Sequence, residues 1–386
     1  MIKKSVKMSL IEKNLLGVRL IDLPSLFPGL ATVSALAWAS IWLSGFIGKQ
    51  LLGFSKSPIS PIMLAIFLGI LVKYYFKLPD IIIPGLTFSV KKVLRLGIIM
   101  LGIRLTIFDI FKLGTFGVPI VAVCIIGALL ITTIINNKLN LPERLGTLIA
   151  VGTSICGVTA IVAAGPAIGA DEEETSYAIT VITIFGLFAT ILYPYLANFI
   201  FAGDINQIGI FLGTSVHETA QVVGAGQIYA DVFSSPKTLD IAVITKLVRN
   251  VFMAFVIPFM AYNYERKEHD ENRIGEKTSF TKLFPVFIFG FLLMAVIRSI
   301  GDANINIGGL AFGLIEKSVW SNAIVFIKEW AEIFLVIALV GVGLSVDLNS
   351  FKKLGKKPFL VGLGASAAVG VISFLTIKII GSFVAM

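Results

Sequence analysis

Long apolar segments recur along the entire chain, and they constrain its fold more than any other feature of the sequence. A run of about 18 or more apolar residues can cross the hydrocarbon core of a bilayer as a helix. Lipid offers the backbone no hydrogen-bond partners, so such runs cross membranes as α-helices. Runs near or above this length occur at residues 30–53, 59–76, 91–108, 115–136, 143–168, 172–201, 206–230, 239–264, 283–300, 320–345 and 357–382. We therefore predict an all-α polytopic membrane protein with about 11 transmembrane segments.

The charge content supports this class and excludes others. Charged residues make up 14% of the 386 residues, whereas soluble domains contain about 25%. The net charge of +9 would suggest nucleic-acid binding in a soluble protein. No basic stripe interleaved with aromatic residues is present, so we expect no nucleic-acid partner. We interpret the excess of lysine and arginine as a mark of cytoplasmic loops, where these residues accumulate.

The chain divides into four parts by polarity. Residues 1–27 form a charged amphipathic segment, 28–264 a first membrane part, 265–282 a polar loop and 283–386 a second membrane part. Lysine and arginine cluster in the N-terminal arm, in the polar loop and in alternate loops between them. Because positively charged loops remain in the cytoplasm, we expect the N-terminus and the polar loop to be cytoplasmic.

Two copies of one polar stretch interrupt the apolar segments. The first, GTSICGVTAIVAAG, runs from Gly152 to Gly165, and the second, GTSVHETAQVVGAG, runs from Gly213 to Gly226. Glycine weakens a helix and Thr and Ser are favoured N-cap residues, so we expect each helix to break and restart here. Two restarting helices present backbone N–H groups and positive dipole ends, which together can bind an anion. The alternative is that Gly, Ser and Thr only allow close helix packing.

The relative orientation of the two copies has two alternatives. One long apolar segment, 172–201, separates them. Two full spans would point the same way, whereas two re-entrant hairpins from opposite sides would meet near mid-membrane. We favour the inverted arrangement. A weaker similarity between residues 101–114 and 340–355 also favours inverted repeats, which are typical of transporters. The substrate-binding residues predicted from the copies are Gly152, Thr153, Ser154, Gly157, Gly213, Thr214 and Ser215, with Gln221 beyond them.

Two ionisable residues, His217 and Glu218, occur in the second copy only. A carboxylate inside a membrane is costly unless it is paired or protonated, and histidine titrates near physiological pH. Both are therefore candidates for coupling transport to protons. The alternative is a buried histidine with satisfied hydrogen bonds and a glutamate that belongs to a structural ion pair.

Candidate partners for the carboxylate follow in ITKLVRN. Lys246 and Arg249 are three residues apart, on one face of a helix, and Asn250 is adjacent. Lys246 could pair with Glu218 or extend toward a surface. Arg249 suits an oxyanion substrate and equally suits structural pairing, and the sequence leaves both roles open.

Motifs for other chemistries are missing. HETAQ begins like a zinc protease motif, but H-E-x-x-H requires a second histidine that is absent, and His269 lies in the polar loop. The two cysteines, Cys124 and Cys156, are dispersed in apolar segments. The sequence has no P-loop, dinucleotide fingerprint or G-x-S-x-G motif. We therefore expect no metal, no cofactor and no enzymatic activity.

Together, LGIRLTIFDIFKLG, GTSICGVTAIVAAGPAIGADEEETSYAI, GTSVHETAQVVGAG and ITKLVRN resemble the YeiH-like sulfate exporter family, over residues 28–382. The resemblance implies a bacterial inner-membrane protein of the cation/proton antiporter and anion transporter superfamily. It also implies inverted repeats, a scaffold and a core, discontinuous helices that cross at the centre, and export of sulfate or a related sulfur oxyanion. The central site would then comprise Gly152–Gly157 and Gly213–Glu218.

The function predicted from the sequence is secondary active transport of a small anion of the sulfate, sulfite or sulfonate type, with coupling through Glu218 or His217. The alternatives are a Na⁺- or H⁺-coupled carrier of another substrate, such as a carboxylate, and an anion channel. Expected partners are the anion, a coupling proton or Na⁺ and the lipid bilayer, and a homodimer is left open.

Overall fold

A computed structural model describes residues 20–51, 57, 59–267, 287–305, 309–346 and 356–380. Within these ranges the secondary structure is helical, apart from an isolated bridge between Ala311 and Ile315. Six described helices are long and apolar enough to cross a membrane: Asp22–Leu51, Gly117–Leu139, Glu172–Ile200, Pro236–Tyr264, Phe287–Ile305 and Lys356–Ile380. The prediction of an all-helical polytopic membrane protein is therefore confirmed. The amphipathic segment 1–27 and the loop 265–282 lie mostly outside the described ranges.

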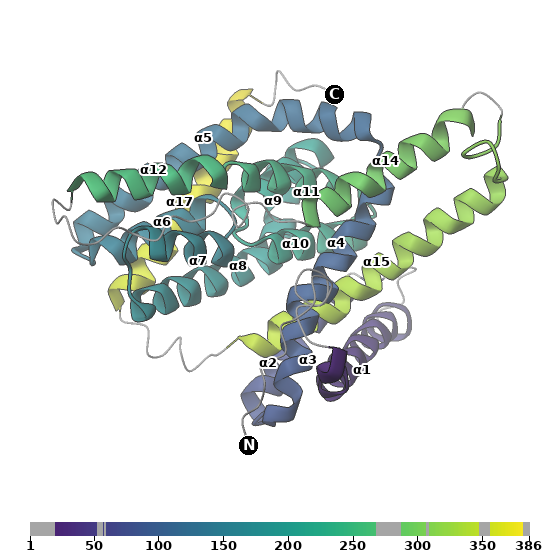
Figure 1. Cartoon of the computed structure of the whole chain (residues 1–386), viewed down its shortest axis with the longest axis horizontal. Helices are drawn as coiled ribbons and strands as arrows, with labels where there is room; N and C mark the ends of the chain where they lie inside the picture. The colour runs from purple at the N-terminus through teal and green to yellow at the C-terminus, as the bar shows by residue number, and fades with distance from the viewer. Residues whose placement is uncertain are drawn as a thin grey trace.

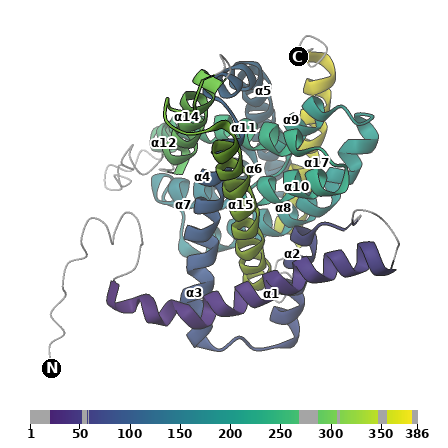
Figure 2. The ribbon, with the colours of Figure 1, turned by 90° about the vertical axis from the view of Figure 1, so that its right-hand side faces the viewer.

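One group of helices, here called the first body, is built around α15. Its helices are α1 (Phe27–Gly45), α2 (Pro61–Tyr75), α3 (Ile83–Phe88), α4 (Leu94–Leu101), α14 (Phe287–Ile305) and α15 (Lys317–Ser345). α15 packs against α1, α2 and α4, and Figure 2 shows α1 lying across α2, α3 and α15. Backbones approach closely where Gly69 of α2 faces Gly343 of α15, as is common for small residues in membrane helices.

The remaining helices form the second body. They are α5 (Ile107–Leu139), α6 (Glu143–Ser154), α7 (Val158–Ala167), α8 (Glu172–Ile200), α9 (Ile205–Ser215), α10 (Thr219–Val232), α11 (Pro236–Val251), α12 (Met253–Lys267) and α17 (Lys356–Ile380). α5 packs on α6, α11 and α17, and α8 packs on α6, α10 and α17. Helices from both predicted membrane parts thus contribute to each body.

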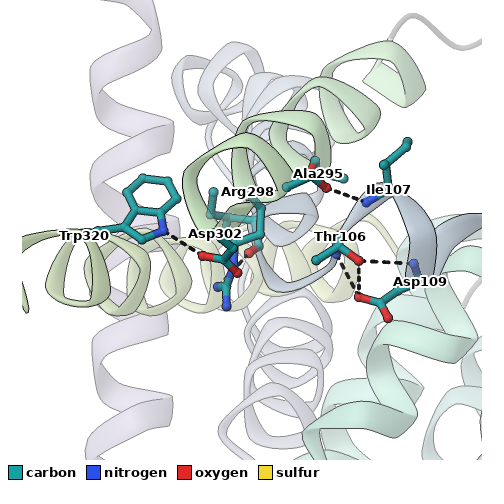
Figure 3. Close-up of polar contacts among 9 residues, drawn as sticks. Thr106, Ile107, Asp109, Ala295, Arg298, Asp302 and Trp320 are labelled. Carbon is teal, nitrogen blue, oxygen red and sulfur yellow. Dashed lines mark hydrogen bonds and ion pairs between the residues drawn. The ribbon is translucent and has the colours of Figure 1, made fainter. Parts of the chain in front are cut away.

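A short turn, Gly102–Arg104, carries the chain from α4 of the first body into α5 of the second. α5 starts with a capping box, because Thr106 and Asp109 satisfy each other's backbone N–H groups. The Ser299 hydroxyl accepts a hydrogen bond from the Ile107 N–H at 2.8 Å. Figure 3 shows this junction. The similar sequence at 340–355 lies at the end of α15, and residues 347–355 are outside the described ranges.

The α6–α7 pair is a hairpin whose two ends lie on the same side of the molecule. Arg144 at the start of α6 is close to Gly169 after α7, where an added Cβ would be 3.9 Å from the guanidinium carbon. α7 packs on α12, and the Thr147 hydroxyl of α6 is 2.7 Å from that of Tyr264 near the end of α12. The hairpin therefore enters from the side where α12 ends, here called the α12 side (Figure 1).

The α9–α10 pair is a hairpin that enters from the opposite side. Both helices pack on α11 near its start, with Gly209 of α9 against Thr238 and Gly226 of α10 against Leu239. α11 and α12 together form one span, Pro236–Tyr264, so the start of α11 and the end of α12 lie on opposite sides. Predicted segments 143–168 and 206–230 are thus hairpins rather than single crossings, and segment 59–76 corresponds to the 15-residue α2.

Candidate functional site

The tips of the two hairpins meet in the second body. α6 ends at Ser154 and α7 begins at Val158, while α9 ends at Ser215 and α10 begins at Thr219. A Cβ added to Gly157, in the first tip, would lie 2.5 Å from Cγ of Glu218 in the second. Gly157 has φ of +71°, a conformation that is costly for residues with a side chain. The two predicted breaks are therefore present and adjacent.

The position of each break differs from the expectation. Gly152, Thr153 and Ser154 end α6, and Gly213, Thr214 and Ser215 end α9, so neither Gly-Thr-Ser triplet caps the start of a helix. The hydroxyl of Thr153 donates to the Ile149 carbonyl at 2.7 Å, and that of Thr214 to the Ile210 carbonyl at 2.7 Å. Bonds to the preceding turn are compatible with a helix, so the helix continues through both triplets. The chain unwinds only in the three residues that follow.

Lys246 on α11 binds the unwound backbone of both tips. Its side chain is fully buried. Nζ donates to the carbonyls of Ile155 at 2.8 Å, Val216 at 3.0 Å and His217. The ammonium group thus joins the tips through carbonyl oxygens and is not ion-paired with Glu218 as the sequence allowed.

Arg249, one turn further along α11, binds the carbonyls at the ends of α6 and α9. Its side chain is also fully buried. Nε donates to Ser154 at 2.7 Å, Nη1 to Thr214 at 2.7 Å and to Val216 at 3.2 Å, and Nη2 to Thr153. The last carbonyls of a helix have no partner within it and carry partial negative charge. Of the two roles left open for Arg249, these contacts correspond to structural pairing, with carbonyls as the partners.

Glu218 lies where the second helices of the hairpins begin. Its backbone N–H donates to Oε1 of Gln221 at 3.1 Å, and Nε2 of Gln221 donates to the Thr183 carbonyl at 3.1 Å. Val158, Glu218 and Thr219 are partly exposed and Thr159 is exposed, whereas residues 152–157 and 213–217 are buried. The accessible part of the site therefore consists of two helix N-termini and one carboxyl group.

Asn250 approaches this accessible part from α11. Its Nδ2 donates to Oγ1 of Thr219 at 3.3 Å. Its Oδ1 is buried and has no hydrogen-bond partner within the described part of the chain. Asn250 was predicted as a partner for Glu218, and the structure places it beside the neighbouring residue.

Two serines of α17, which were not among the residues predicted from the sequence, contact the second hairpin. Oγ of Ser366 is 2.6 Å from Nε2 of the fully buried His217, and Oγ of Ser373 is 2.6 Å from Oγ1 of Thr214. Nδ1 of His217 makes no hydrogen bond to any residue that the structure describes. The two serines are seven residues apart, on one face of a helix, and this recurrence in segment 357–382 is the signal that could have identified them.

The charges at the tips favour an anion. Lys246 and Arg249 contribute two positive charges, and Glu218 contributes one negative charge when ionised. Each helix end carries about half a charge, negative at the ends of α6 and α9 and positive at the starts of α7 and α10, so these four terms cancel. The centre therefore has a net charge of about +1 with Glu218 ionised and about +2 with Glu218 protonated. No group of three or more His, Cys, Asp or Glu suited to a metal is found among the described residues.

Comparison with known proteins identifies the family. Residues 28–362 match the family described as Conserved hypothetical protein 698. A UPF0324 membrane protein of Fusobacterium nucleatum is 30% identical over 328 residues, covering 84% of this chain and 91% of the relative. UPF0324 membrane proteins of Bacillus anthracis (33%, covering 83% and 87%) and Listeria monocytogenes (32%, covering 84% and 90%) are similar. No solved structure matches the chain. The chain therefore belongs to the Conserved hypothetical protein 698 family of multi-pass membrane proteins.

Proposed function

We propose that the protein is a secondary active transporter of a small anion of the sulfate, sulfite or sulfonate type. The observation that carries the proposal is the pair of accessible helix N-termini, at Val158 and Thr219. They belong to the same two hairpin tips that the buried cations Lys246 and Arg249 hold together. Lys246 and Arg249 bind carbonyls of the hairpin tips, so the two positive helix ends face Glu218, which forms a capping box with Gln221 at the start of α10, and a ligand. An anion bound there receives backbone N–H groups and a net positive field.

Glu218 is the proposed coupling group. Protonation of its carboxyl group raises the net charge of the centre from about +1 to about +2, which matches a divalent oxyanion. The carboxylate itself lies against Gly157 at the start of α7, where an anion would also bind. Anion binding and protonation therefore support each other. His217 is fully buried and bound to Ser366, so we assign it a positioning role.

Hairpins that enter from opposite sides also support a carrier. Alternating access uses elements related by inversion around a central site. The proposal includes the inverted repeats, the superfamily implied by the YeiH-like resemblance, and a bacterial inner membrane with the N-terminus in the cytoplasm.

A second candidate function is Na⁺-coupled transport of a substrate such as a carboxylate. The observation that favours it is the buried Oδ1 of Asn250, which has no hydrogen-bond partner among the described residues, while its Nδ2 donates to Thr219 next to Glu218. Sodium binds oxygen ligands of this kind. Dependence of flux on Na⁺ at constant pH distinguishes this candidate from the first.

Uptake of radiolabelled anions into proteoliposomes that contain the protein tests both candidate functions. We expect saturable flux of radiolabelled sulfate or sulfite that increases as external pH falls, because protonated Glu218 favours the anion. Glu218→Gln mimics the protonated side chain and should remove the pH dependence. Glu172→Gln, an exposed residue at the start of α8, is the matched control and should retain it. An unchanged pH profile in Glu218→Gln contradicts the coupling role, and the lack of saturable flux for all these anions contradicts the substrate class.

A further inference from the structure

A cluster of charged residues joins the two bodies at the turn between α4 and α5. Arg104 ends this turn, and its Nε donates to Oδ1 of Asp240 on α11 at 2.6 Å. The same guanidinium donates to the Pro236 carbonyl at 3.1 Å and contacts Glu332 of α15 at 3.4 Å. The side chains of Arg104 and Asp240 are only 7% and 13% exposed. Lys328 of α15 is also within electrostatic range of this pair.

A second polar contact joins the bodies at the same side. The Ser60 hydroxyl, which caps the start of α2, donates to Oδ2 of Asp231 at 2.7 Å. Nε2 of Gln227 holds the other oxygen of this carboxylate at 2.8 Å. Asp231 lies near the end of α10, and α11 begins at Pro236. Both contacts therefore bind the first body to the connection between α10 and α11, here called the corner, which lies on the side opposite to the α12 side.

The interface deeper in the molecule is apolar, because buried residues of both bodies, among them Ile66 of α2 and Val223 of α10, form one hydrophobic cluster. Gly224 of α10 faces Leu339 of α15 and Ile62 of α2, where an added Cβ would be 3.5 Å and 3.8 Å from their side-chain carbons. Such surfaces resist sliding weakly, because dispersion contacts between apolar atoms have little directionality. The directional bonds described for the corner, in contrast, fix one position of the bodies.

Helix α11 connects the corner to the hairpin tips. Asp240 and Lys246 lie on the same helix, α11, which also carries Arg249. A displacement of the start of α11 away from α15 therefore moves the two cations that hold both tips. The contacts at the corner thus control the position of the central site relative to the first body.

We propose that Arg104, Asp240 and Glu332, together with Ser60 and Asp231, form a latch that holds the two bodies closed on the side opposite to the α12 side. Opening requires the Arg104–Asp240 and Ser60–Asp231 contacts to break while the apolar interface slides. The latch concerns the motion of the bodies, so it does not depend on which solute is carried.

Distance measurements between spin labels test the latch. Lys317 at the start of α15 and Lys237 at the start of α11 are both exposed and lie in different bodies. They are replaced by cysteine and labelled in the full chain, in lipid nanodiscs, with Cys124 and Cys156 replaced by alanine. The latched state gives a single narrow distance distribution in double electron–electron resonance, and opening shifts it to longer distances.

The variants Arg104→Gln and Asp240→Asn each remove the central contact of the latch. We expect the population with a longer distance to increase about tenfold in both, equivalent to about 1.4 kcal/mol. The matched control is Arg298→Gln. Arg298 pairs with Asp302 of the same helix, α14, at 2.5 Å (Figure 3) and donates to the carbonyl of Ile103 in the Gly102–Arg104 turn, so this variant removes one bond to the turn but none of the latch contacts. This control should keep the short distance.

Three results are possible, and each is decisive. A longer distance in Arg104→Gln and Asp240→Asn, but not in Arg298→Gln, supports the latch. Unchanged distances in the two latch variants overturn it. An equal change in the control also overturns it, because the longer distance then reflects a general loss of packing between the helices rather than loss of the latch contacts. If Arg104→Gln is not recovered as folded protein, Asp240→Asn preserves the shape of the side chain and gives the same readout.

Discussion

Replacing Arg249 by glutamine should release the tip of the first hairpin. Arg249 donates to four carbonyls, two from α6 and two from the second hairpin, and glutamine is too short to reach them all. A buried carbonyl left without a partner costs at least about 1 kcal/mol, so the four together amount to about 4 kcal/mol. A difference of this size corresponds to about a thousandfold change in the equilibrium for local opening.

Cys156 reports this opening directly. It lies in the first tip, it is 5% exposed, and its Sγ is 3.6 Å from Sδ of Met253. With Cys124 replaced by alanine it is the single thiol of the chain. We expect its reaction with a maleimide in nanodiscs to be slow in this background and to accelerate by about two to three orders of magnitude in Arg249→Gln.

The matched control is Arg95→Gln, because Arg95 is an exposed arginine of α4, in the first body. Its removal should leave the labelling rate of Cys156 unchanged. A rate in Arg249→Gln that stays within about threefold of the background would refute the reasoning, since four lost bonds of ordinary strength cannot have so small an effect. An equal acceleration in Arg95→Gln would refute it as well.

Two further predictions concern the tips. Gly157→Ala places a methyl group against Glu218 at positive φ, so we expect transport to be lost while membrane insertion is retained. Gly117→Ala in α5, where an added Cβ meets nothing within 4 Å, should transport normally, and equal flux in the two variants would contradict the prediction. Ser366→Ala removes the hydrogen bond to Nε2 of His217, whose Nδ1 has no partner among the described residues, and should lower the free energy of unfolding by about 1–3 kcal/mol. Ser366→Thr should restore it, and an alanine variant with unchanged stability would rule out the contact.

Part of the candidate site could be predicted from the sequence. The repeated Gly-Thr-Ser stretches marked both breaks, because a glycine-rich polar stretch is out of place in an apolar helix. Lys246 and Arg249 were identified as candidate partners because a buried carboxylate such as that of Glu218 needs one. Their acceptors could not be found in this way, since backbone carbonyls are present at every residue. The break was predicted three residues too early, because N-cap preference does not show whether Thr and Ser bond backward into the preceding turn.

The sequence by itself determined that the chain is an all-helical membrane protein, because long apolar runs leave the backbone no other way to satisfy its hydrogen bonds in lipid. Only the tertiary structure decided how those runs are used. An apolar segment of a given length can cross the bilayer or fold back as a hairpin, and the choice depends on what packs around its midpoint. Here α11 supplies two buried cations that hold the ends of α6 and α9 together, and this makes two hairpins from opposite sides stable at the centre.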